Sequence, residues 1–135
     1  MAYETKGFSH TFPASTGLGQ YRGVSLNSNG RLINPTTEGY IIGILTSSGT
    51  TGSTGRAGST DSGSVQTVQY AGIAKIVAGT TTIDIGDRLK VDTDGRASTA
   101  SSTSYLFGVA LQSVNSTSTS AQVISVLLQP GHIPA

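Results

Sequence analysis

The chain of 135 residues contains no cysteine and no tryptophan, and only 11% of its residues are charged. Without cysteine, neither a disulfide framework nor a thiolate zinc site can form. Runs of the strong helix formers Ala, Leu, Glu and Lys are also missing, whereas Gly, Ser and Thr are abundant. The length suits one domain, and this composition predicts an all-β domain with generous loops.

The chain also has almost no excess of one charge sign over the other. Eight Lys plus Arg oppose seven Asp plus Glu, which leaves a net charge of +1 scattered along the chain. Nucleic-acid binding needs a concentrated basic patch, so we expect no nucleic-acid partner. The first residues lack the pattern of a secretion signal, and no apolar run approaches the length of a membrane span. We therefore expect a soluble protein that is made in the cytoplasm and has no membrane partner.

The residue patterns that carry catalysis are also absent. The two histidines, His10 and His132, lie near the chain ends, and no Gly-x-Ser-x-Gly elbow or paired-carboxylate motif occurs. Asp84 and Asp87 bracket Gly86, and we interpret them as groups that cap turn amides. We therefore expect no catalytic residue and predict that the protein is not an enzyme.

One stretch, Asp92-Thr-Asp-Gly95, resembles half of a calcium loop. An EF-hand needs Gly at its sixth position and a bidentate Glu at its twelfth, and here Gly95 is fourth while Thr103 stands in the place of the Glu. Asp and Asn before Gly are typical of tight turns, because they tolerate positive φ. We interpret the stretch as a turn, and we expect no metal and no cofactor.

Residues 1 to about 20 combine the aromatic residues Tyr3, Phe8 and Phe12 with Pro13 and three glycines. The segment shows neither the alternation of a strand nor the period of a helix. We expect an extended N-terminal arm whose rings are buried against the body of the chain or on a neighbour. A chain that starts near Gln20 is then expected to fold by itself.

Residues 21–135 are predicted to form the single β domain. Tyr21 to Leu26 alternate apolar and polar residues, Asn29-Gly30 marks a tight turn, and Leu32-Ile33 resumes the apolar pattern, which predicts a β-hairpin. Further strands are predicted at residues 40–45, 65–70, 74–77, 80–85 and 88–91. Residues 47–64 are almost entirely Gly, Ser and Thr, so we expect a flexible loop there.

The chain repeats itself when it is aligned with its own second half so that Gly30 falls on Gly95, and no gap is needed nearby. We predict an internal repeat with these two glycines in equivalent hairpins. Each copy is too small to cover its own apolar face, so the two should bury a shared core as a small β-barrel, with a sandwich as the alternative. The further identities are Arg31 with Arg96, Tyr40 with Tyr105, and Gly43 with Gly108.

Three motifs follow one another in the second half of the chain. They are Ile85-Gly-Asp-Arg-Leu-Lys-Val91 with its following Asp94-Gly95, Phe107-Gly-Val-Ala-Leu111, and Val123-Ile-Ser-Val-Leu-Leu128. With the arm and an early strand that ends near a Gly, this order of parts resembles the small β-barrel decoration, or cement, proteins of tailed bacteriophage heads. The resemblance covers roughly residues 20 to 130.

The resemblance implies a protein of the virion that binds the outer surface of an assembled icosahedral capsid and stabilises it against the pressure of the packaged DNA. It implies the major capsid protein as partner, and self-association, often as a homotrimer. Tyr3, Phe8 and Phe12 of the arm would then contact the capsid or a neighbouring subunit, while Gly30 and Gly95 would be structural turn residues.

A phage fibre or carbohydrate-binding β-domain is the alternative function. In that case aromatic residues should cluster on a concave face, and Tyr40, Tyr70 and Tyr105 are the candidates. Tyrosines on strands also serve ordinary packing, so the pattern alone does not choose between these two roles.

Overall fold

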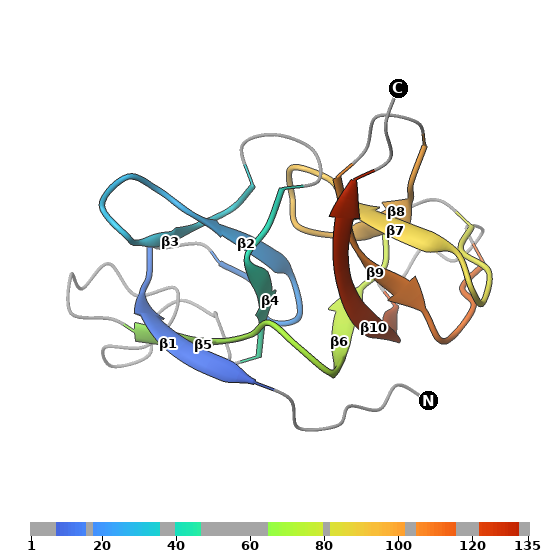
Figure 1. Ribbon diagram of the computed structural model, residues 1–135, viewed down its shortest axis with the longest axis horizontal. Helices are drawn as coiled ribbons and strands as arrows, with labels where there is room; N and C mark the ends of the chain where they lie inside the picture. The colour runs from blue at the N-terminus through green and yellow to red at the C-terminus, as the bar shows by residue number, and fades with distance from the viewer. Residues whose placement is uncertain are drawn as a thin grey trace.

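A computed structural model describes residues 8–15, 18–35, 40–46, 65–79, 82–101, 105–115 and 122–132. Within these residues the protein is all β, with ten strands and no helix, arranged as two sheets side by side (Figure 1). Each sheet has five strands, and all pairings between the strands are antiparallel. The predicted all-β fold is confirmed, whereas the predicted loop at 47–64 lies outside the described residues.

We call the unit that contains β1 to β5 the first lobe and the unit that contains β6 to β10 the second lobe. The strands of the first lobe, in sheet order, are β1 (Ser9–Pro13), β5 (Val65–Gln69), β4 (Gly43–Leu45), β2 (Gly23–Leu26) and β3 (Leu32–Ile33). Those of the second lobe, in sheet order, are β6 (Ile73–Val77), β10 (Val123–His132), β9 (Tyr105–Ala110), β7 (Arg88–Val91) and β8 (Ala97–Thr99).

The strand order is therefore the same in both lobes, which confirms the internal repeat and extends it to all ten strands. The first strand of each lobe pairs with the last, and a parallel bridge joins the end of the first strand to the third. These bridges are Ala14 with Leu32 and Ala78 with Ala97. Each sheet thus curls until its two edges meet, as the predicted small barrel requires.

The apolar core is divided between the lobes. One cluster consists of first-lobe residues alone, whereas the other consists of second-lobe residues plus Ile44 of β4. The expectation of one shared core therefore needs correction, because each curled sheet covers most of its own apolar face. The first cluster is Ala14, Leu18, Val24, Leu32, Leu45 and Val68.

The segment predicted as an arm contains strand β1, which corrects the expectation that it forms no strand. Ser9–Pro13 pairs with β5 along its whole length. Ala14 and Leu18, which follow, are only 1% and 2% exposed. At least this part of the segment belongs to the first lobe, where β1 is the counterpart of β6.

Three consecutive residues of the first lobe, Tyr21 to Gly23, form hydrogen bonds with the second lobe. The Tyr21 carbonyl accepts a hydrogen bond from the Val77 amide at 2.8 Å, and the Gly23 amide donates to the Gly95 carbonyl at 2.8 Å. Between them, Arg22 Nη1 donates to the Asp94 carbonyl at 3.1 Å. We call residues 21–23 the clasp.

The clasp brings the backbones of Gly23 and Gly95 close together, and it contains a residue with positive φ. A Cβ on Gly95 would lie 2.5 Å from the Gly23 carbonyl oxygen, so no larger residue fits there. Among the described residues, Tyr21 is the one residue other than glycine with positive φ, at 61°. The Lys75 Nζ lies 5.5 Å from the centre of the Tyr21 ring, in a cation–π contact from the second lobe.

Candidate interaction surface

The calcium-like stretch is a turn, as predicted. Asp92 Oδ1 accepts hydrogen bonds from the amides of Asp94 and Arg96 at 2.9 and 3.0 Å. In the first lobe, Asn27 Oδ1 accepts the same two bonds, also at 2.9 and 3.0 Å. The neutral amide oxygen of Asn27 thus accepts the same bonds as the carboxylate of Asp92, so both residues cap their turns.

The predicted turn glycines are equivalent as well. Gly30 and Gly95 have φ of 74° and 79°, and each amide donates to the carbonyl three residues earlier at 3.0 Å. Their surroundings differ, because nothing lies within 4 Å of a Cβ built on Gly30, whereas Gly95 is packed against the clasp. The interpretation of Asp87 is also confirmed, since its Oδ2 accepts the Asp84 amide at 2.9 Å.

The described residues contain no group of three or more His, Cys, Asp or Glu side chains that could hold a metal ion. In the same residues, no helix is long and apolar enough to cross a membrane. The features that remain to be explained are aromatic side chains on the surface.

The three predicted contact residues of the arm have different surroundings. Tyr3 lies outside the described residues. Phe12 is partly buried and packs against the apolar cluster of the first lobe. Phe8 is 67% exposed, and its ring stacks on Tyr70 at 6.1 Å between centroids. The contact role predicted for them stays a prediction, with Phe8 the most available side chain of those described.

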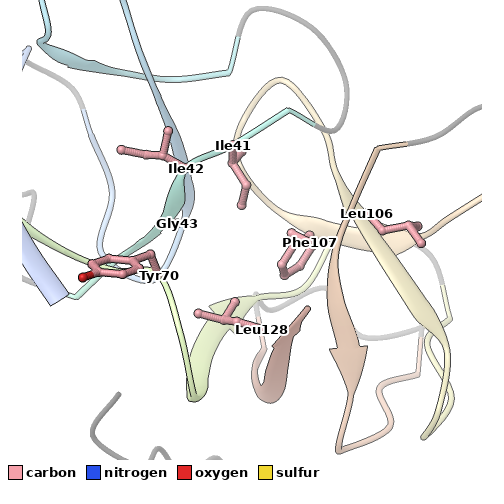
Figure 2. A pocket seen from close by; sticks show the side chains of 7 residues that line it. All are labelled: Ile41, Ile42, Gly43, Tyr70, Leu106, Phe107 and Leu128. Carbon is pink, nitrogen blue, oxygen red and sulfur yellow. The ribbon is translucent and has the colours of Figure 1, made fainter. Parts of the chain in front are cut away.

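A small apolar groove of about 30 Å³ lies where the two lobes meet (Figure 2). Its walls come from both lobes, and in Figure 2 Tyr70 and Leu106 lie at its opposite sides with Phe107 between them. None of the described residues that line it is charged. The lining residues are Ile41, Ile42, Gly43, Tyr70, Leu106, Phe107 and Leu128.

Among the described residues that line this groove, Tyr70 is the one exposed aromatic side chain. Tyr70 lines it and carries Phe8 stacked upon it. Tyr40 and Tyr105, the chain neighbours of the lining residues Ile41 and Leu106, touch each other edge to face at 5.9 Å. We call the groove together with Tyr70 and the Phe8 ring stacked on it the aromatic groove.

The repeat itself builds the aromatic groove. In the alignment that places Gly30 on Gly95, Ile41 corresponds to Leu106 and Ile42 to Phe107, as Tyr40 does to Tyr105. Tyr70 corresponds to Leu128, because each donates its amide to the residue that precedes the first strand of its lobe. Those bonds are Tyr70 to Phe8 at 3.0 Å and Leu128 to Gly72 at 2.9 Å.

Of the three tyrosines that the sequence offered for a concave aromatic face, Tyr70 lines this groove, whereas Tyr40 and Tyr105 contact each other and are not among its lining residues. The sequence did not predict that Phe8 would stack on Tyr70 or which apolar residues would line the groove. These residues come from strands and strand ends far apart in the chain, so no local pattern could have predicted their meeting.

The comparisons with known proteins find matches among solved structures. No protein family and no curated protein sequence matches the chain. Among solved structures, it is similar to the N base of the head fibre gp8.5 of bacteriophage phi29, with a TM-score of 0.64 and 16% sequence identity. The match covers 95% of this chain and 98% of that one. The two proteins share a fold over nearly their whole lengths.

Proposed function

We propose that the protein is a structural component of a bacteriophage head, bound to the outer surface of the capsid. The observation that carries this proposal is the shared fold with the base of a phage head fibre over 95% of the chain. The sequence motifs resemble head decoration proteins, which supports the same location independently. The partner would be the major capsid protein, and the protein would be part of the virion.

Decoration of the shell is the more specific role that we propose. The two lobes are held together by the clasp, and the surface at their junction presents apolar and aromatic groups without charge. Such a surface suits a lasting contact between proteins, in which buried aromatic rings supply much of the binding energy. We propose a binding role without catalysis.

Carbohydrate binding, as in a fibre-type domain, is the second candidate, and one observation favours it. Tyr70 is an exposed ring in the groove, and the exposed rings of Tyr40 and Tyr105 contact each other, so the surface offers aromatic platforms for sugar rings. Against it, the groove lining offers few polar groups other than the tyrosine hydroxyl to fix a sugar by hydrogen bonds.

Two binding experiments with the purified protein distinguish these functions: one with undecorated heads of its phage and one with a panel of glycans. Decoration predicts saturable binding, so that the protein sediments with the heads. The carbohydrate function predicts binding to a glycan and no binding to the heads. Replacement of Phe8 by Ser tests the contact predicted for the arm, and Ile85→Ser is a matched control, since Ile85 is 69% exposed and lies outside the groove. Absence of saturable binding to heads would contradict the decoration function.

A further inference from the structure

One dipeptide of the first lobe, Asn29-Gly30, carries a reactive chemistry that the binding functions do not use. In an Asn-Gly pair the glycine nitrogen can attack the side-chain carbonyl of the Asn, because no Cβ on the following residue hinders the approach. A serine in that place hinders the attack, and a proline nitrogen has no hydrogen to give up. The other Asn residues of the chain, which precede Ser or Pro, are Asn27, Asn34 and Asn115.

The structure leaves this dipeptide accessible. Asn29 and Gly30 are both exposed, and nothing lies within 4 Å of a Cβ built on Gly30. Among the described residues, the Asn29 side chain has no hydrogen-bond partner. The side chain of Asn27, in the same turn, is instead held, because its Oδ1 accepts the amides of Asn29 and Arg31. The geometry therefore favours reaction at Asn29 over reaction at Asn27.

The internal repeat supplies a matched comparison at Asp94-Gly95. Each glycine amide donates one hydrogen bond within its own turn at 3.0 Å, so this bond does not distinguish the two turns. The clasp does distinguish them. Arg22 Nη1 donates to the Asp94 carbonyl at 3.1 Å, the Gly23 amide donates to the Gly95 carbonyl at 2.8 Å, and Gly95 is buried whereas Gly30 is exposed.

The attack of the glycine nitrogen requires the peptide group between the two residues to rotate, since this nitrogen and the preceding carbonyl lie in one plane. In the second turn that rotation would pull the Asp94 carbonyl away from Arg22 and would move Gly95 against the Gly23 carbonyl. The first turn has no such contacts among the described residues, so its peptide group is free to rotate.

From these observations we propose that Asn29 is a site of spontaneous deamidation, in which its side-chain amide becomes a carboxylate without an enzyme. The Gly30 nitrogen loses its proton to solvent and forms a bond to Asn29 Cγ, while the side-chain nitrogen takes up a proton and leaves as ammonia. Water then opens the resulting cyclic imide. Addition of water at the side-chain carbonyl gives aspartate, and addition at the backbone carbonyl gives isoaspartate, in which the chain runs through the former side chain.

The two products have different consequences for the first lobe. The repeat has Asp94 at the equivalent position, so aspartate fits the turn and simply adds one negative charge to a chain of net charge +1. Isoaspartate lengthens the backbone by one carbon, which displaces the amides of Gly30 and Arg31 from their acceptors on Asn27. Leu32, which follows, is fully buried. Isoaspartate is therefore expected to loosen the hairpin of β2 and β3.

Peptide mapping of the full chain, aged at mildly alkaline pH either folded or in urea, tests the proposal. Cleavage after Lys and Arg releases residues 23–31, with Asn27 and Asn29, and residues 91–96, with the second turn. Fragmentation in the mass spectrometer locates each conversion, and an isoaspartyl methyltransferase detects isoaspartate. In the folded protein we expect both products at Asn29 and far less conversion at Asn27.

Asp94→Asn is the matched variant, because it places the same Asn-Gly pair in the turn that the clasp holds. In the folded variant the new pair is expected to react about tenfold or more slowly than Asn29 of the same molecule, since its reaction must break the hydrogen bonds of the clasp. In urea the two pairs should react at equal rates. Far-UV circular dichroism shows whether the variant is folded.

Each outcome decides the question. Conversion of Asn29 in the folded wild type, with slower reaction at the second turn of folded Asp94→Asn, supports the proposal. A wild type that converts Asn29 in urea but not when folded overturns it, and this comparison needs no variant. Equal rates at the two turns of the folded variant would contradict the protection by the clasp. The test uses no capsids or glycans, so its result is independent of the proposed function.

Discussion

Asn27 and Asp92 accept the same pair of backbone hydrogen bonds in two hairpins that the internal repeat relates to each other. An amide and a carboxylate share few chemical properties beyond an acceptor oxygen at the same place. The pair therefore shows that the hairpin needs an acceptor at this position, and that the negative charge of Asp92 is incidental to the turn.

Asp92→Asn is predicted to leave the free energy of unfolding unchanged within about 0.5 kcal/mol, because the amide keeps both bonds. Asp92→Ala removes the acceptor and is predicted to cost about 1 kcal/mol. Urea denaturation of the two variants measures both effects. A large loss in Asp92→Asn, together with a wild-type melting temperature that rises in calcium, would show that the carboxylate binds a metal.

Gly95→Val is predicted to destabilise the protein more than Gly30→Val does. Both replacements force a β-branched residue to positive φ, at a cost of about 1 to 3 kcal/mol. At Gly95 the new side chain would also collide with the Gly23 carbonyl and the Arg22 Cβ, whereas the space at Gly30 is open. Equal losses in the two variants, measured by urea denaturation, would contradict the close approach at the clasp.

Pro13→Val is predicted to produce larger and less defined assemblies than the wild type. The substitution gives the exposed edge of β1 the outward amide that Val77 has on β6, and open strand edges pair readily with other chains. Thr11→Val is the control, because it changes an exposed side chain on the same strand while the backbone donors stay the same. Light scattering that is unchanged in Pro13→Val would mean that Pro13 does not protect this edge.

Removal of residues 1–20 is predicted to unfold the first lobe or to destabilise it by several kcal/mol. The truncation removes the whole of β1 and the buried Leu18, whose burial alone contributes about 1.5 to 3 kcal/mol. Removal of residues 1–7 alone is predicted to leave the far-UV circular dichroism unchanged. This reverses the expectation that a chain starting near Gln20 folds by itself, and a stable, cooperative melt of the shorter chain would restore it.

The sequence predicted the features that depend on local chemistry. Asn27, Gly30 and their counterparts could be recognised as turns, because tight hairpins need acceptors and positive φ at fixed spacings. Matching apolar registers around those turns then revealed the repeat. The first step uses residues within a few positions of each other, and the second compares two such segments of the chain.

The features that the sequence did not predict depend on distant partners. Strand β1 has four exposed residues and one partly buried one, so it lacks a clear apolar alternation and owes its conformation to pairing with β5. Its Pro13 is compatible with this strand, because proline is accepted at a sheet edge. The aromatic groove likewise exists because the lobes meet there, and the meeting depends on the clasp.

Electron microscopy of undecorated phage heads incubated with the protein tests the proposed function most directly. The proposal predicts added density on the outer surface of the capsid, of a size that accommodates the two lobes, at regular positions of the shell. Heads that carry no added density at saturating protein, while the protein itself is folded, would contradict the assignment to the capsid surface.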